Sequence, residues 1–406
     1  MSDVRLKFNP LEVYICHLRC HLYPSGPVDL GLQSLKAGDL TKDYASVKTD
    51  VPLFNQAAVS FAALFFAAQH HENRILTEGY AMHGIALQRL NKALGVPGCH
   101  TSDEVLVSVV ILAMLELYMP SGPRNYLKHM LGLERLLELR DPGSLVHASY
   151  RTLELYKGVR HMILIASLWN RSPSIFARPR WKVVLRTALS LDTPEEQDLH
   201  DVLADCSVLI AASDEIVSSQ PAQTPKILQR RAEIESRAST LLDFLKAWKG
   251  RWDGAEGNLY AHEENPAAVS TDAPAELCTI YRFKDDSVGR MFMLYNTALI
   301  YVLQVYATLA TLDFTYSDAA SSISIMSENY HRASRTAGIE VARSITDYLQ
   351  HKRARGETDF ASPVVQWAVL TAWQALGGTE SREGEYMTMM LKGNTSYEIV
   401  KAAWDM

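Results

Sequence analysis

Signals that begin and end α-helices recur along the whole chain, whereas patterns typical of β-strands are almost absent. Capping boxes, in which Ser or Thr is followed three residues later by Glu, occur at 101–104 and 193–196. Asp141, Pro142 and Gly143 would end the helix that precedes them, because proline and glycine interrupt helical structure. The sequence therefore predicts an all-α protein.

The expected helices follow one another closely. They cover residues 9–22, 51–71, 73–94, 101–119, 124–140, 144–169, 193–219, 224–248, 279–309, 322–351, 363–376, 381–391 and 396–404. We expect them to form a single large multi-helix domain over residues 1–406, with a buried central helix. The loop at 250–274 is the only linker-like stretch, so a soft domain boundary would fall there.

The composition is that of an ordinary globular protein. Of the 406 residues, 48% are hydrophobic and 21% are charged, and the net charge is −6. A mildly acidic chain argues against a nucleic-acid-binding surface, which is usually strongly basic. The N-terminus has no basic segment followed by an apolar run, so no signal peptide is predicted. The five scattered cysteines indicate free thiols in a reducing compartment, and we expect a cytoplasmic protein.

Two cysteines and two histidines lie near the N-terminus, at Cys16, His17, Cys20 and His21. Each pair is spaced four residues apart, so either pair could chelate a metal ion from a helix. The same segment also fits an amphipathic helix capped by Asn9, and no second group of ligands lies nearby in the sequence. We favour the structural helix over a zinc site.

The most apolar long helix is expected over residues 279–309, and Lys284 lies near its start. A projection at about 100° per residue puts Lys284 on the apolar stripe with Ile280. A cation on the inner face of a buried helix needs a counter-charge or a bound anion, or it loses its proton. Asp285 would serve as the counter-charge, whereas Asp286 points away. The alternatives are a lysine that reaches solvent and aspartates that stabilise the helix N-terminus.

Part of that segment, residues 291–310, is long enough to cross a membrane. No basic loop flanks it, and its neighbours are amphipathic helices. We therefore expect a buried core helix and no membrane span.

Two other segments resemble the regulatory domain of fungal zinc-cluster transcription factors. Residues 126–142, YLKHMLGLERLLELRDP, are similar to its pattern H..G...LL..RGP, and residues 171–181, RSPSIFARPRW, to its pattern R.P.F...P.W. The resemblance covers about residues 50–350. The six-cysteine cluster that binds DNA in those regulators is absent, since five scattered cysteines cannot build it. The chain is expected to be the regulatory half alone or an enzyme on that scaffold.

Ile280 and Lys284 have an aliphatic-x-x-x-Lys spacing that resembles the humulene synthases of fungal tropolone-sesquiterpenoid pathways. Those all-α cyclases hold a diphosphate with a magnesium cluster and an essential lysine. The resemblance implies a magnesium-dependent sesquiterpene cyclase that ionises farnesyl diphosphate and closes an eleven-membered ring to humulene, with release of diphosphate. Lys284 would be catalytic and would contact the diphosphate.

Such a reaction needs Mg²⁺ ligands, a cation beside the leaving diphosphate and aromatic walls around the carbocation. The candidate metal ligands are Asp285, Asp286, Asn329, Glu340 and Asp205, and the candidate substrate contacts are Lys284, Ile280, Arg332, Tyr295 and Phe292. For the acidic residues the alternative is a solvated helix face, and for the aromatic residues it is filling of the core.

The leading hypothesis is therefore a sesquiterpene cyclase that uses Mg²⁺ and a small isoprenoid diphosphate, without a nucleic-acid partner. The alternative is a non-enzymatic regulatory or ligand-sensing domain of transcription-factor type, without a DNA-binding zinc cluster. The sequence has no G-x-S-x-G, P-loop or G-x-G-x-x-G motif, so hydrolases, NTPases and dinucleotide enzymes have no support.

Overall fold

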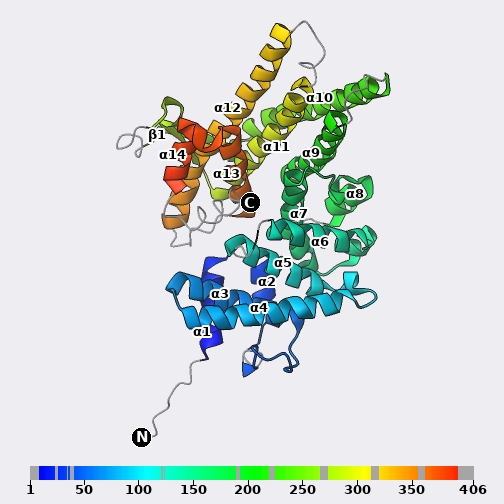
Figure 1. Cartoon of the computed structure of the whole chain (residues 1–406). Helices are drawn as coiled ribbons and strands as arrows, with labels where there is room; N and C mark the ends of the chain where they lie inside the picture. The colour runs from blue at the N-terminus through cyan, green and yellow to red at the C-terminus, as the bar shows by residue number, and fades with distance from the viewer. Residues whose placement is uncertain are drawn as a thin grey trace. The chain divides into compact units, whose positions relative to one another are not determined.

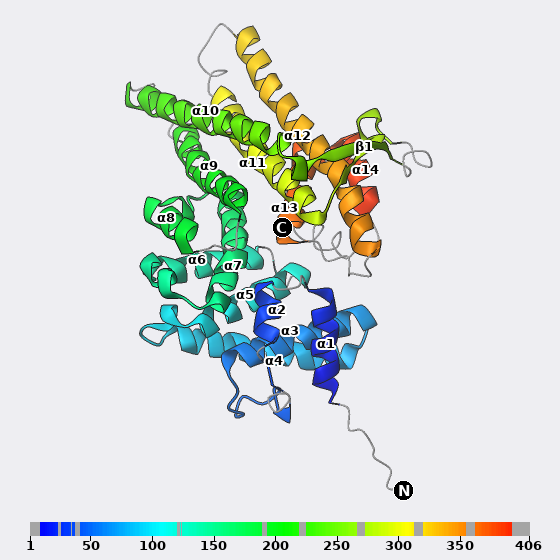
Figure 2. The same cartoon turned by 180° about the vertical axis from the view of Figure 1, so that it is seen from behind.

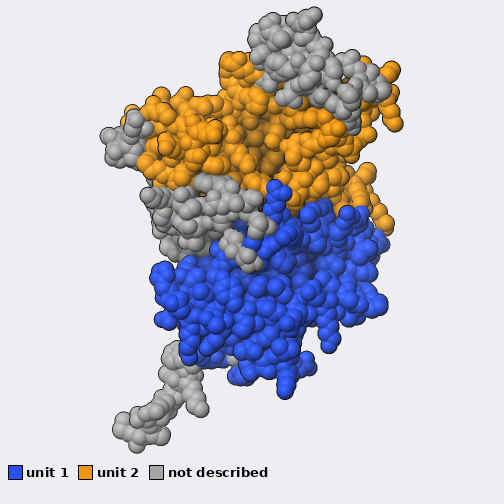
Figure 3. Space-filling model, viewed as in Figure 1, with its two compact units in different colours: residues 1–163, 405–406 blue, residues 164–404 orange. Residues whose placement is uncertain are grey.

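The computed structural model describes residues 9–22, 26–33, 35–36, 41–119, 122, 124–188, 193–218, 225–265, 273–311, 320–354 and 362–391. Regular structure in these ranges is almost entirely helical, so the all-α prediction is confirmed. The chain forms two compact units (Figure 3): unit 1 is Met1–Ile163 with Asp405–Met406, and unit 2 is Leu164–Trp404. The division falls inside helix α7 (Tyr150–Trp169), and the segment 250–274, predicted as a loop, belongs to unit 2 and contains the end of α10 (Pro225–Asp253) and the strand β1 (Tyr260–Glu264).

Unit 1 is built around α3, which contacts α1, α4 and α5 (Figure 1) and is buried along most of its length. Its helices are α1 (Pro10–His21), α2 (Pro27–Leu32), α3 (Leu53–His70), α4 (Asn73–Leu94), α5 (Asp103–Tyr118), α6 (Asn125–Glu138) and the first part of α7, with 3₁₀ turns at Cys99–Thr101 and Pro142–His147. The predicted N-terminal helix is confirmed, because the Asn9 side chain accepts a 3.1 Å hydrogen bond from the backbone N–H of Leu11.

Unit 2 has α11 at its centre, in contact with α9, α10, α12 and α13 (Figure 2), as expected for the buried helix. Its helices are α8 (Pro179–Ala188), α9 (Pro194–Ser218), α10 (Pro225–Asp253), α11 (Asp286–Thr311), α12 (Ala320–Ala354), α13 (Pro363–Ala375) and α14 (Arg382–Leu391), with 3₁₀ turns at Ile175–Ala177, Glu256–Asn258, Ala275–Leu277 and Gly378–Glu380. The helix predicted at 396–404 lies outside the described residues.

A two-stranded antiparallel hairpin interrupts the helices of unit 2. Strand β1 (Tyr260–Glu264) pairs with β2 (Thr279–Phe283), so that Tyr260 lies opposite Phe283. The prediction of a helix from residue 279 onward is therefore wrong for its first seven residues, since α11 begins at Asp286. Thr279, Ile280, Tyr281 and Phe283 are β-branched or aromatic residues, which favour a strand once a partner strand is present.

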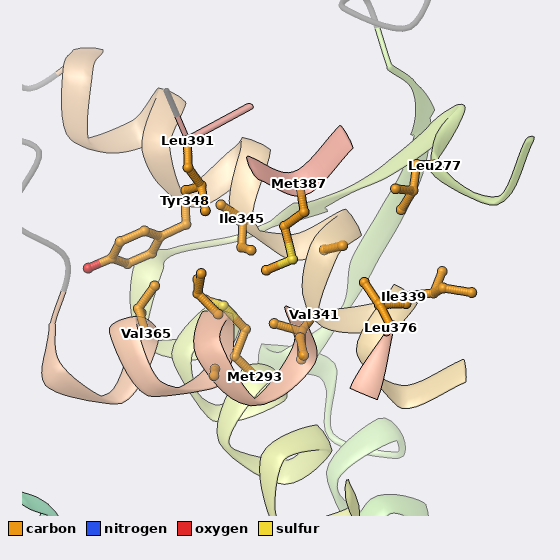
Figure 4. Packing of buried hydrophobic residues seen from close by; sticks show 14 of the residues in the cluster. Leu277, Met293, Ile339, Val341, Ile345, Tyr348, Val365, Leu376, Met387 and Leu391 are labelled. Atoms are coloured by element: carbon orange, nitrogen blue, oxygen red, sulfur yellow. The ribbon is translucent and has the colours of Figure 1, made fainter. Parts of the chain in front are cut away.

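The core of unit 2 lies beside the hairpin, between α11, α12, α13 and α14 (Figure 4). Met293 of α11 is fully buried there against Val341 and Ile345 of α12 and Met387 of α14. Close packing of such side chains fixes how these helices lie against one another. The candidate site residues on these helices are therefore held in place by a closely packed core.

One described helix, over Asp286–Ala310, is long and apolar enough to cross a membrane. Within its most apolar window, however, 72% of the residues are buried inside the protein. Burial of this extent agrees with the predicted core helix, because a core helix passes the same length and composition test.

Candidate functional site

Lys284 lies on the bend between β2 and α11, and its side chain is exposed. The prediction that it points along the inner face of a buried helix is therefore wrong. Ile280 is a residue of β2 and is 1% exposed. Because β2 ends at Phe283 and Lys284 follows it on a bend, Ile280 and Lys284 are not one helical turn apart, which is the spacing that the cyclase comparison needs.

Asp285 caps the N-terminus of α11. Its Oδ1 accepts hydrogen bonds from the backbone N–H of Ser287 at 2.8 Å, from the Ser287 hydroxyl at 2.5 Å and from the backbone N–H of Val288 at 3.2 Å. The Ser287 hydroxyl is the largest cause of the lowered pKa of Asp285. Asp286 is the half-buried first residue of α11. This geometry matches the alternative in which the first-turn acids stabilise the helix end.

Glu340 of α12 is engaged by neighbouring side chains. The hydroxyl of Tyr281 donates a 2.5 Å hydrogen bond to its Oε2, and Nη1 of Arg343 lies 3.3 Å from its Oε1. Burial raises the pKa of Tyr281, and Glu340 adds to this effect. Asn329 and Arg332, on earlier turns of α12, are exposed. Glu340 therefore joins the hairpin to α12.

Asp205 of α9 forms an ion pair with Lys182 of α8 at 2.7 Å. Asp198 and Asp201 share Arg186 of α8, at 2.9 and 2.7 Å. The acidic face of α9 is thus neutralised by α8 rather than presented to a metal ion. Within the described ranges, no group of three or more His, Cys, Asp or Glu side chains is arranged to hold a metal. The predicted Mg²⁺ ligands do not assemble into a site that fits the ion.

Phe292 and Tyr295 belong to an aromatic cluster around Lys249 of α10. The Lys249 Nζ lies 5.2 Å from the ring centroid of Phe292, and 5.7 and 5.9 Å from those of Tyr260 and Tyr295. It also contacts the Asp253 carboxylate at 2.5 Å. The aromatic side chains predicted as substrate walls therefore enclose a lysine of the same chain. Lys249 is not among the predicted site residues, although its four-residue spacing to Asp253 indicates a pair on one helix face.

An open cleft of about 610 Å³ lies between α11, α12 and α13. Leu303 and Ala307 of α11 line its apolar part, and Arg332 and Arg335 of α12 line its rim. A cleft of this volume suits a small organic molecule. Of the predicted site residues, Arg332 alone lines it, together with Arg335 of α12 and Gln304 of α11, which the sequence did not single out.

Two segments, residues 126–142 and 171–181, carry the family resemblance and are called here the first and second family-like segments. Arg140, in the first family-like segment, joins three parts of unit 1. Its Nη1 donates hydrogen bonds to Asp103 at 2.8 Å and to the Tyr156 hydroxyl at 2.9 Å, and its Nε donates to the carbonyl oxygen of His100. Its side chain is 8% exposed. This arginine therefore connects the ends of α5 and α6 to α7.

Arg171, in the second family-like segment, has a comparable role in unit 2. It follows α7 with a left-handed backbone (φ 53°) and donates two 2.5 Å hydrogen bonds to the carboxylate of Asp214 on α9. Phe176 and Trp181 of the same segment pack edge to face with their centroids 5.5 Å apart. Both family-like segments thus build the scaffold.

Comparison with known proteins supports the resemblance that these two segments indicated. Residues 48–357 match the family described as fungal specific transcription factor domain, and the chain belongs to that family. A curated relative, uncharacterized protein AN5342 of Emericella nidulans, is 26% identical over 131 residues, which are 32% of this chain. The chain spans only 28% of that relative's length. No solved structure matches the chain.

Proposed function

We propose that this chain is a non-enzymatic regulatory module of fungal transcription-factor type, which responds to a small molecule bound in the cleft between α11, α12 and α13. The observation that carries the proposal is the cleft itself, whose walls on α11 and α12 lie within the residues that match the family. A ligand that binds in the cleft can shift the protein between two conformational states only if it binds one state more tightly than the other.

The residues predicted to take part in catalysis support a sesquiterpene cyclase less than the cleft supports a regulatory module. Lys284 is exposed, Asp285 caps a helix and Asp205 is paired with Lys182. A cyclase must neutralise a leaving diphosphate inside a pocket that excludes water. The cyclase activity and its use of Mg²⁺ stay predictions.

A reporter assay tests the regulatory function. The full chain is fused to a heterologous DNA-binding domain in yeast, and the output of a matched promoter is compared with that of the DNA-binding domain alone. We expect the fusion to change the output. Gln304→Trp, which places a large ring at an exposed position of the cleft, should remove the change.

The matched control is Gln229→Trp, at an exposed position of α10 that does not line the cleft. It should leave the response intact. An output that equals that of the DNA-binding domain alone, or a response that Gln304→Trp leaves unchanged, would go against the proposed function.

A further inference from the structure

The inner part of the cleft between α11, α12 and α13 is apolar. Ile300, Leu303 and Leu376 line it and are 5%, 4% and 2% exposed. The ring of Tyr330 also lines it and is stacked on Tyr306, with 4.9 Å between the centroids. An apolar chain placed against these side chains would be removed from water, which is favourable in proportion to the area buried.

The rim of the same cleft carries two arginine side chains, each paired with a carboxylate. Two guanidinium groups, those of Arg332 and Arg335, line it together with one carboxylate, that of Glu328. Glu328 pairs with Arg332 at 3.1 Å, and both side chains are more than half exposed, so this pair is weak and easily exchanged.

Arg335 is held in place from outside the cleft. Its Nη2 donates a 2.5 Å hydrogen bond to the buried carboxylate of Glu383 on α14, which does not line the cleft. A guanidinium has five N–H donors in a fixed plane, so Arg335 can bind a second anion while Glu383 orients it. Its side chain is 37% exposed, which leaves it accessible to a ligand.

We infer that the cleft binds a small amphipathic anion, with a carboxylate or phosphate at Arg332 and Arg335 and an apolar body against Ile300 and Leu303. The inference rests on the proposed function, and it names the chemical class of the effector. A neutral molecule of the same length would lack the charge-assisted hydrogen bonds, and a cationic one would meet only carboxylates that already engage Arg332 and Arg335.

Isothermal titration calorimetry of the full chain with probes that share a decyl chain tests the inference. The probes are decanoate, decyl phosphate, decan-1-ol and decyltrimethylammonium, each below its micellar concentration. We expect at least one of the two anions to bind about tenfold more tightly than decan-1-ol, and the cation not to bind. The comparison of decanoate with decyl phosphate identifies the head group.

Variants locate the binding site. Arg332→Gln and Arg335→Gln should each weaken binding of the anion about threefold to tenfold and leave decan-1-ol unchanged. Because Arg335→Gln also breaks the contact with buried Glu383, Arg332→Gln is the primary variant. Its matched control is Arg230→Gln, which removes an exposed arginine paired with Glu215 away from the cleft.

Equal affinity for the anions and decan-1-ol, no binding of any probe, or full anion affinity in both arginine variants would overturn the inference. A reporter response that depends on Gln304 would still support the proposed function in each of these cases. Conversely, selective binding of the anion to a chain that gives no reporter response would support the inference about the ligand and contradict the regulatory role.

Discussion

The hydroxyl of Tyr281 donates a 2.5 Å hydrogen bond to Oε2 of Glu340, and this bond joins the hairpin to helix α12. A second connection lies beside it, because Asp347 accepts hydrogen bonds from Arg282 at 2.9 Å and from the backbone N–H of Phe283 at 3.0 Å. The segment 279–283, expected to begin a helix, is thus fixed as a strand by side chains about sixty residues later in the sequence.

Tyr281→Phe should destabilise the protein by about 1–2 kcal/mol, because it leaves the half-buried Glu340 carboxylate without its hydroxyl donor. Thermal unfolding followed by circular dichroism measures the effect. Tyr80→Phe is the control, since Tyr80 is 48% exposed, and it should leave the unfolding temperature unchanged. Equal behaviour of the two variants would show that the bond to Glu340 does not stabilise the fold.

Arg171→Gln should destabilise the protein by about 1–2 kcal/mol, because both hydrogen bonds to the Asp214 carboxylate are lost while residue 171 keeps its left-handed backbone conformation. Each partner is about one-third exposed, so solvent screening keeps the cost at this level. Arg230→Gln, which breaks a more exposed pair, should cost no more than about 0.5 kcal/mol. Urea titration of both variants makes the comparison.

Lys249→Met should reduce stability by about 1 kcal/mol, because the ammonium lies over three aromatic rings and beside Asp253. Lys246→Met, at a lysine that is 66% exposed, is the matched control. We expect a measurable loss only for Lys249→Met in urea titration. A loss of the same size in both variants would indicate a general charge effect.

Stability should fall as the pH drops below about 6.5. Burial lowers the pKa of His83, and likewise that of His129, so the folded state prefers neutral imidazole. The unfolded chain takes up these protons near its ordinary pKa of about 6.5, and the stabilisation present above that pH is lost as the pH falls through the folded-state pKa. The free energy of unfolding, measured between about pH 7.5 and 5.5, should show this slope.

The same measurement on His83→Gln should give a shallower slope, whatever the variant's absolute stability. The lowered pKa of Asp285 does not interfere, since its contribution is lost only at about pH 4 and below. An unchanged slope would show that His83 is not one of the titrating groups.

Lys284→Ala should change stability by no more than about 0.5 kcal/mol, because the side chain is exposed on a bend. It should also leave binding of the decyl anions unchanged, since Lys284 does not line the cleft. A large loss of anion binding in this variant would place the anion site at Lys284 instead of Arg332.

Local signals explain why most helices were predictable. The Thr193 hydroxyl accepts a 3.2 Å hydrogen bond from the backbone N–H of Glu196, so the N-cap predicted by the first half of the capping box is present at the start of α9. At the other predicted box the cap is Ser102 rather than Thr101, which is a shift of one residue. Such signals act within one helical turn, and a sequence therefore displays them directly.

The strand β2 could not be predicted in the same way. Its stability depends on pairing with β1, where Glu264 lies opposite Thr279, and on Glu340 and Asp347 of α12. None of these partners is close in sequence, and a run of apolar residues fits a helix and a strand alike. The inward direction expected for Lys284 depended on a helix that begins at residue 279, and the expected catalytic site depended on that direction. Residues 279–283 form a strand instead.

The cleft was only partly predictable for a related reason. Arg332 was singled out as an anion contact and does line the cleft, but Gln304 and Leu376 approach it from other helices. A helical projection identifies which residues share a face, whereas the neighbouring helix that meets that face is set by tertiary packing.

The most direct test of the choice between a non-enzymatic module and a cyclase is incubation of the purified full chain with farnesyl diphosphate and Mg²⁺, followed by gas chromatography and mass spectrometry of the headspace. The proposed function predicts no hydrocarbon above the level of a heat-inactivated sample. An eleven-membered cyclic sesquiterpene that forms in proportion to protein concentration and needs Mg²⁺ would contradict it and restore the cyclase hypothesis.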